Sequence, residues 1–256
     1  MLIDTHCHIH EVNYPLDIDD VMARAHHEGV SQMICVGTSE ASSRAALEFA
    51  SSHDGVFASI GVHPHDTKDG WTEISELAGP AVGSTNAHGK LVAVGEIGLD
   101  YFYSHSPHEV QIEALQSQIE LALKYDLPII FHVRDAFEDF WPILDNFHGI
   151  RGVLHSFTDT QASVEEGLKR GLYIGVNGIS TFTKDESQKT MFSSIPLEKL
   201  LLETDAPFLT PVPFRGKVNE PAFVRTIAEY HSAIRQKSFD EIANATTANA
   251  RALFAL

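Results

Sequence analysis

The stretch LVAVGEI at residues 91–97 shows the pattern on which the fold prediction depends. Five small or apolar residues precede a glutamate, in a run that is too short for a helix and lacks the apolar–polar alternation of a half-exposed strand. Such a run is typical of a parallel strand that is buried on both faces. Comparable runs along the chain predict seven more strands, at 2–8, 31–37, 56–61, 128–133, 152–156, 172–176 and 200–204.

Stretches with helical periodicity separate these strands. In residues 107–126 the apolar side chains recur every three or four positions, and Pro107 suits the start of a helix. The alternation of eight strands with helices predicts an α/β fold, a single-domain TIM (β/α)8 barrel over residues 1–256. Other helices are expected at 17–28, 39–53, 135–147, 160–170, 187–194 and 220–235, with one or two more in 238–256, and loops at 177–187 and 205–219.

The composition narrows the class of protein and its location. We find no apolar run of about 18 residues, the length that a membrane span needs, and the start lacks the basic and apolar regions of a signal peptide. The 2 cysteines, Cys7 and Cys35, are too few for a disulfide framework. We therefore expect a cytoplasmic protein with no membrane association, and a monomer.

The formal net charge of −17 argues against a broad basic groove for nucleic acid. A small pocket that grips one phosphate group through metal ions is still compatible with this charge. The 15 histidines point toward metal binding, although some of them are expected on the surface.

Polar side chains lie at the predicted ends of five apolar strands, which is where a TIM barrel carries its chemistry. A charged or polar group buried there is costly unless it is paired or bound to a metal. The residues in question are His6, His8, Glu96, His132, His155 and Asp205.

His6 and His8 are two positions apart, so in a strand both rings point to the same face and can hold one metal. The spacing alone is weak, since His8/His10 and His63/His65 share it, and the alternative is a pair of hydrogen-bonded core histidines. Their place at the end of the first strand favours the metal.

The carboxylates extend this interpretation. An inward-facing Glu96 can bridge two cations, and the alternative is a salt-bridged or helix-capping glutamate. Glu203 shares a face with Asp205 if the last strand extends that far, so that one orients water or a ligand while the other contacts metal. Four neutral histidines and two carboxylates carry −2, so two divalent cations give a pocket near +2 that attracts a phosphate.

The motifs in order resemble the TatD family of metal-dependent hydrolases along nearly the whole chain. The matching segments are IDTHCH (3–8), GVHP (61–64), GEIGLDY (95–101), HVRDA (132–136), LHSF (154–157), ETDAPFL (203–209), RGKVNEP (215–221) and TTANARALF (246–254).

The resemblance implies an amidohydrolase-like barrel with two divalent metal ions, or three. It implies one metal held by His6, His8, Glu96 and Asp205, and another held by Glu96, His132 and His155. It also assigns His63 to the substrate pocket and Arg134 to a position near the metal ligands or facing the phosphate. Ser156 departs from the pattern, because relatives often carry Cys there, but it is not itself a ligand.

We therefore expect a metal-dependent deoxyribonuclease, a 3′–5′ exonuclease that acts on DNA ends or single-stranded DNA through a metal-bridged hydroxide. Asp205 is expected to accept or steer the proton, with Glu96 and Glu203 as the other catalytic carboxylates and His63 and Arg134 as phosphate contacts. The ligand types suit Zn²⁺, Mn²⁺ or Fe²⁺, with Mg²⁺ as a further working ion.

Two alternatives stay open at this point. The same pocket suits ester or amide hydrolysis, and relatives resembling this chain include D-aminoacyl-tRNA deacylases, which would make aminoacyl-tRNA the substrate. The other alternative is a non-catalytic metal-binding barrel, since a fold does not fix a function. Such a purely structural site is expected to be closed rather than open to water.

Overall fold

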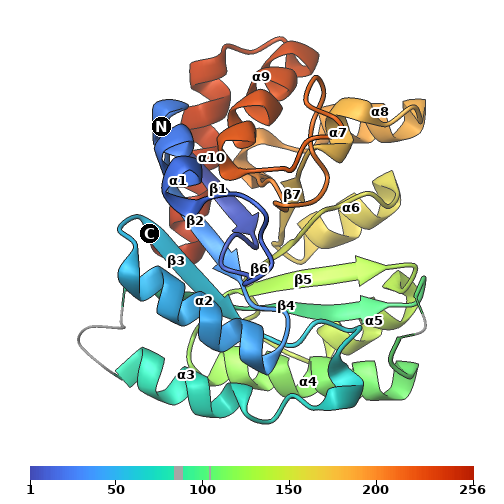
Figure 1. The fold of residues 1–256 in the computed structure, drawn as a ribbon. Coiled ribbons are helices and arrows are strands. Elements are labelled where there is room, and N and C mark those ends of the chain that lie inside the picture. The colour runs from blue at the N-terminus through green and yellow to red at the C-terminus, as the bar shows by residue number, and fades with distance from the viewer. Residues whose placement is uncertain (84–88, 104) are drawn as a thin grey trace. The chain divides into compact units, whose positions relative to one another are not determined.

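The computed structural model describes residues 1–83, 89–103 and 105–256 of the chain (Figure 1). All eight predicted strands are present, and they form one parallel sheet in sequence order. A parallel bridge between Cys7 and Ala206 joins the segment after the last strand to the end of the first. The TIM-barrel prediction is therefore confirmed. The strands are β1 (Leu2–Cys7), β2 (Val30–Val36), β3 (Val56–Ile60), β4 (Leu91–Asp100), β5 (Ile129–Arg134), β6 (Gly152–Leu154), β7 (Tyr173–Val176) and β8 (Leu200–Leu202).

The helices follow the predicted pattern with two corrections. An unpredicted helix covers Ile74–Gly83, where Gly79 and Pro80 argue against helix in sequence but Ile74 and Ala78 pack into a buried apolar cluster. A short helix also lies in the predicted 177–187 loop. The α-helices are α1 (Ile18–His27), α2 (Glu40–Ser52), α3 (Ile74–Gly83), α4 (His108–Lys124), α5 (Phe137–Asp145), α6 (Gln161–Lys169), α7 (Ile179–Phe182), α8 (Glu186–Ser194), α9 (Val224–Arg235) and α10 (Phe239–Phe254), and the 3₁₀ turns are η1 (Thr67–Asp69), η2 (Leu197–Lys199) and η3 (Pro221–Phe223).

The chain divides into two compact units. Unit 1 comprises residues 1–34 and 156–256, and unit 2 comprises residues 35–155. The expectation that residues 1–256 act as a single domain stays a prediction. Within the parts of the chain that the structure describes, no helix combines the length and the apolar character needed to cross a membrane.

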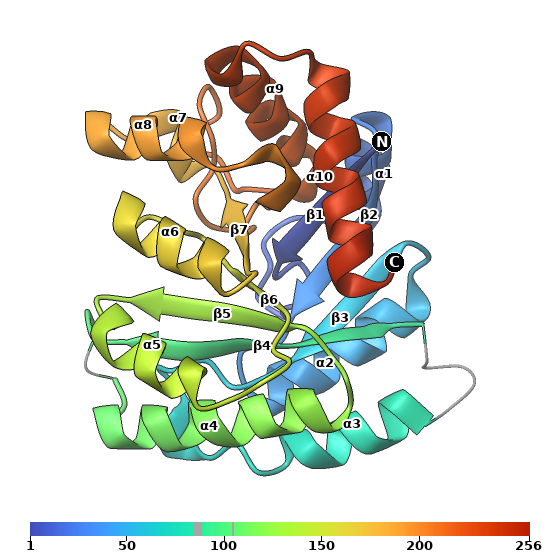
Figure 2. The same ribbon diagram turned by 180° about the vertical axis from the view of Figure 1, so that it is seen from behind.

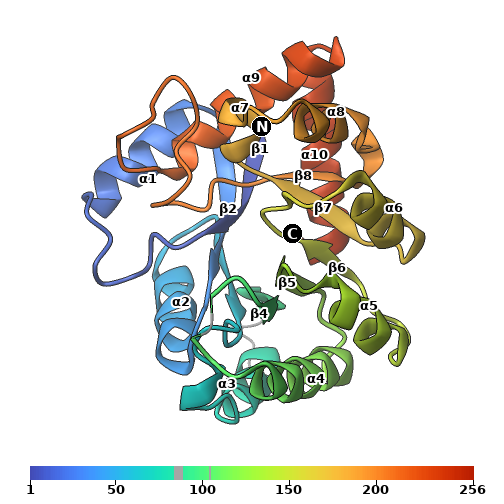
Figure 3. The ribbon, with the colours of Figure 1, turned by 90° about the vertical axis from the view of Figure 1, so that its right-hand side faces the viewer.

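Unit 1 brings both ends of the chain together. Helix α10 packs against β1 and β8, and Figure 3 shows it beside β8. The helix begins with a capping box, in which Ser238 accepts from the Glu241 amide while the Glu241 side chain accepts from the Ser238 amide. It also packs on α9, so the carboxyl-terminal segment covers β1, which carries His6, and β8, which precedes Asp205.

Unit 2 contains β3 to β6 with the helices between them. Helix α4 lies along β4, as Figure 2 shows, and its Gln118 side chain bonds both backbone groups of Val62. The strands β4 and β5 are paired in parallel up to Asp100 and Arg134. Strand β4 thus continues three residues beyond the predicted end at 97, because glycines in GEIGLD do not interrupt it.

A buried histidine in unit 1 predicts how stability changes with pH. His231 in α9 is fully buried, with Nε2 3.2 Å from the Ser180 hydroxyl. Burial, aided by the Arg235 charge, lowers the pKa of His231 from 6.5 to about 3. The folded state therefore resists protonation, so this contribution to stability is complete above the unfolded pKa and is lost as pH falls from 6.5 toward 3.

We expect His231→Gln to remove this dependence, because glutamine does not titrate. Between pH 7 and pH 5 the wild-type free energy of unfolding should fall by about 2 kcal/mol more than that of the variant. Denaturant titrations at the two pH values measure the difference. His148→Gln, which changes an exposed histidine, is the matched control. Equal pH dependence in wild type and His231→Gln would show that His231 does not cause it.

Candidate metal centre and active site

Glu96 lies inside β4 rather than at its end, which corrects the sequence prediction. A bulge places it there. Val94 pairs with Ile129 and Ile97 with Phe131, so β4 has one more residue than β5 over this interval. The extra residue changes the direction of the neighbouring side chains. Gly95 permits the bulge, since its φ is 151° and a Cβ at this position would collide with Ile130.

Three histidine nitrogens surround one oxygen of this buried glutamate. Glu96 Oε1 lies 2.8 Å from Nδ1 of His132, 3.2 Å from Nε2 of His155 and 3.5 Å from Nε2 of His63. The four residues come from β4, β5 and the segments that follow β6 and β3. The structure therefore brings together, within unit 2, all three residues expected there as metal ligands and the expected substrate-pocket histidine.

The electrostatics keep this carboxylate ionised. Burial raises the pKa of Glu96, but the electrostatic interaction with His155 and hydrogen bonds from His132 and His155 outweigh it, so the pKa lies well below its usual range. Burial and the nearby His132 lower the pKa of His63, which therefore stays neutral. A neutral imidazole keeps a lone pair on one nitrogen, as a metal ligand must.

Asp100, the last residue of β4, holds His132 from its other side. Nε2 of His132 lies 2.9 Å from Asp100 Oδ2, and His65 Nε2 lies 3.0 Å from the same oxygen. A carboxylate on one imidazole nitrogen fixes the ring and its tautomer, which leaves Nδ1 to face Glu96. Sequence reasoning missed Asp100 and His65. Their signals are a carboxylate in GEIGLDY and the second histidine of GVHPHD, whose two-residue spacing from His63 is by itself weak evidence.

In unit 1, His6 and His8 converge on Asp205. Their Nε2 atoms are 3.1 Å apart, and they lie 3.6 Å and 3.3 Å from Asp205 Oδ1. The same-face prediction for the two histidines at the end of β1 is thus supported by their geometry. Two ring nitrogens and a carboxylate oxygen at this spacing form a second group of metal-type donors.

The backbone after β8 directs Asp205 toward these rings. Its amide donates to the carbonyl of His6 over 2.9 Å, and its φ is 59°, in the left-handed region. Aspartate tolerates this conformation better than most residues with a side chain. Because β8 ends at Leu202, it does not extend to Glu203 and Asp205, and the condition for a shared strand face is not met.

Glu203 is held apart from this turn. It is buried, and its Oε1 accepts from the Ser156 amide over 2.6 Å. Gly175 in β7 leaves space for the carboxylate, because a Cβ at this position would meet its oxygens. A ligand atom of Glu203 lies within 4.8 Å of one of His6, so Glu203 is close enough to act beside the first donor group.

A second carboxylate that sequence reasoning missed is Asp4, inside β1. It is fully buried, and it accepts from the Thr204 amide over 2.9 Å and from the Thr204 hydroxyl over 2.6 Å. Burial outweighs these hydrogen bonds and raises the pKa of Asp4 to about 8. Asp4 also accepts a hydrogen bond from the backbone amide of His6, over 3.3 Å. It therefore stabilises the strand on which the histidine pair begins. Its signal was a carboxylate within the apolar run of β1.

Arg134, predicted to contact phosphate, packs against an aromatic side chain. It is the last residue of β5, it is exposed, and its guanidinium carbon lies 3.8 Å from the ring centroid of Phe102. The structure therefore places it against an aromatic ring of the loop that follows β4.

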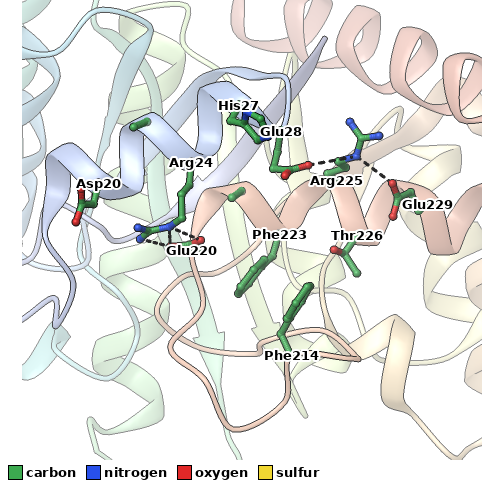
Figure 4. A pocket seen from close by; sticks show the side chains of 12 residues that line it. Asp20, Arg24, His27, Glu28, Phe214, Glu220, Phe223, Arg225, Thr226 and Glu229 are labelled. Atoms are coloured by element: carbon green, nitrogen blue, oxygen red, sulfur yellow. Dashed lines mark hydrogen bonds and ion pairs between the residues drawn. The ribbon is translucent and has the colours of Figure 1, made fainter.

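A cavity of about 550 Å³ lies elsewhere in unit 1, between α1 and the start of α9 (Figure 4). Arg24 bonds Glu220 through two nitrogens, and Arg225 lies between Glu28 and Glu229. Both guanidinium groups are therefore matched by carboxylates. None of the predicted site residues lines this cavity, so we do not assign the chemistry to it.

The donor chemistry fits divalent cations. His63, Glu96 and His132 each offer a ligand atom, and these atoms lie within 4.8 Å of one another. Imidazole nitrogen combined with an ionised carboxylate suits Zn²⁺, Mn²⁺ or Fe²⁺. Buried His/Glu/Asp groups able to hold metal ions, carried on the strands of a TIM barrel, define a metal-dependent hydrolase.

Comparisons with known proteins identify the family. The chain matches the model of the TatD related DNase family over residues 3–255, and it belongs to this family. It is 40% identical to the uncharacterized metal-dependent hydrolase YabD of Bacillus subtilis, over 99% of each chain. It is 37% identical to the 3′-5′ ssDNA/RNA exonuclease TatD of Salmonella typhimurium, over 93% of each. The crystal structure of the TatD homologue YjjV from Escherichia coli superposes with a TM-score of 0.90 at 31% identity, over 100% of this chain and 98% of that one.

Proposed function

We propose that this metal-dependent hydrolase is a 3′–5′ exonuclease that hydrolyses phosphodiester bonds at the ends of single-stranded DNA. The observation that carries the proposal is the convergence of His132, His155 and His63 on one oxygen of the ionised Glu96. The relative from Salmonella typhimurium, named an ssDNA/RNA exonuclease, supports this substrate class.

We assign a divalent cation to each donor group. One would be held by His6, His8 and Asp205, and the other by Glu96, His132 and His155. Bound there, the cations would activate a water molecule and neutralise charge on the phosphate. The bridging of both metals by Glu96 and the presence of a third metal stay predictions, as does the identity of the metal.

The side chains around these groups have separate tasks. Asp205 accepts or steers the proton of the attacking water, since its carboxylate lies beside the histidine pair. Glu203, fixed by the Ser156 amide, orients that water or the ligand. His63, neutral and next to Glu96, contacts the phosphate, and Asp100 keeps the His132 ring in position.

A digestion assay tests the proposal. Purified protein treated with chelator, then supplied with Mn²⁺, Mg²⁺, Zn²⁺ or Fe²⁺, is incubated with single-stranded DNA labelled at its 5′ end. We expect metal-dependent shortening by single nucleotides, blocked by phosphorothioate linkages at the 3′ end. Cleavage that starts at internal bonds, or at the 5′ end, would contradict the exonuclease polarity.

A second substrate distinguishes phosphodiester hydrolysis from the alternative, ester hydrolysis of aminoacyl-tRNA. D-aminoacyl-tRNA is offered under the metal condition that gives the highest activity, and release of the amino acid is followed. Rapid deacylation together with intact oligonucleotides would replace the nuclease proposal by ester hydrolysis.

A further inference from the structure

An exposed aromatic surface follows β4 in unit 2, next to the donor group of Glu96. We call it the Phe102 platform, and it comprises Phe102, Tyr103 and the Arg134 guanidinium. Phe102 is 53% exposed and Tyr103 is 43% exposed, and their rings meet edge to face with centroids 4.7 Å apart. The guanidinium carbon of Arg134 lies 3.8 Å from the Phe102 centroid and 5.1 Å from that of Tyr103.

Asp100 connects this platform to the metal donors. Its Oδ1 accepts from the amides of Phe102 and Tyr103, each over 3.0 Å, so it fixes the turn that presents both rings. Its Oδ2 lies 2.9 Å from Nε2 of His132, whose other nitrogen faces Glu96. One buried carboxylate thus positions the platform and a metal ligand together. The His65 ring extends this group, since its centroid lies 5.4 Å from that of Tyr103 and its Nε2 lies 3.0 Å from Oδ2 of the same Asp100.

We infer that the Phe102 platform stacks on an unpaired nucleobase at the end of a single-stranded substrate, and so selects frayed or single-stranded ends. This inference rests on the proposed function and adds the residues that recognise the base. Aromatic faces and guanidinium planes both stack on bases, and a paired base inside a duplex does not offer its face in this way.

The charge of the chain strengthens the inference. A net charge of −17 does not supply the many phosphate contacts that hold nucleic acid to basic proteins. Base stacking binds without positive charge and tolerates any sequence, because every base has an aromatic face. An exonuclease that moves along a strand of any sequence needs a binding interaction that does not depend on the sequence, such as base stacking.

The test compares three substrates in four variants. The substrates are a single-stranded oligonucleotide, the same oligonucleotide with an abasic 3′-terminal residue, and bis(p-nitrophenyl) phosphate, which has no base to stack. The variants are Phe102→Ala, Tyr103→Ala, Phe102→Trp and the control Tyr173→Ala. Tyr173 also carries a cation over its ring, with Lys199 Nζ at 4.4 Å, but it starts β7 rather than following the carboxyl end of a strand.

We expect Phe102→Ala and Tyr103→Ala each to raise KM for the natural oligonucleotide about 10-fold. KM for the abasic oligonucleotide and turnover of the small diester should stay close to wild type. Phe102→Trp, which keeps an aromatic ring, should retain the wild-type KM. Tyr173→Ala should leave the kinetics on all three substrates unchanged.

Two results would overturn the inference while leaving the proposed function intact. One is an unchanged KM in both alanine variants, and the other is an equal loss on natural and abasic ends. A wild-type enzyme that cleaves the small diester but leaves every oligonucleotide intact would overturn the proposed function itself, and this inference with it.

Discussion

Glu96→Gln is expected to abolish most of the hydrolytic activity. Glutamine has the same size but no charge, so His132, His155 and His63 would face a neutral amide instead of a carboxylate. Loss of this ligand removes several kcal/mol of charge stabilisation, and we expect the rate of digestion to fall by at least about 1000-fold. Single-turnover digestion of labelled oligonucleotide measures the rate, and titration calorimetry with Mn²⁺ measures the weakened binding.

Glu113→Gln is the matched control for this experiment. It makes the same change on the exposed face of α4 in the same unit, and its digestion rate should equal that of wild type. Circular dichroism of both variants checks that the barrel is folded. Full activity and unchanged Mn²⁺ binding in Glu96→Gln would refute the assignment of Glu96 as a ligand.

Most of the fold was predictable because buried parallel strands leave a strong trace in sequence. Each of the eight apolar runs is a strand, and each strand pairs in the predicted order. Helix α3 was not predictable, because Gly79 and Pro80 argue against it locally and only the packing of Ile74 and Ala78 outweighs them. This helix forms because of tertiary contacts, which a local sequence pattern does not reveal.

The site was predictable in its residue types and less so in its geometry. His6 and His8 follow from strand alternation, since residues two apart share a face. The position of Glu96 depends on a bulge between Val94 and Ile97, and the pattern of hydrophobic residues carries no sign of it. Asp100 escaped notice because its role depends on the orientation of the His132 ring, which only a three-dimensional structure gives.

Asp205→Asn is expected to remove the charge of this residue while leaving its backbone conformation unchanged. Asparagine also adopts the left-handed conformation readily, so the turn with φ of 59° and the bond from its amide to His6 should persist. The variant keeps a side-chain oxygen near His8 but can no longer accept a proton. We expect kcat to fall by roughly 10²–10⁴-fold, with little change in KM.

Asp126→Asn is the control that isolates this effect. Asp126 also has a positive φ, of 52°, and its side chain is 95% exposed in the ion pair with Arg151, so the same substitution there changes only a solvent-exposed charge at a left-handed position. Steady-state kinetics on oligonucleotide at saturating Mn²⁺ should show wild-type kcat for Asp126→Asn and the large loss for Asp205→Asn. A loss confined to KM would mean that Asp205 positions the substrate and does not handle the proton, because an interaction equal in ground and transition states leaves kcat unchanged.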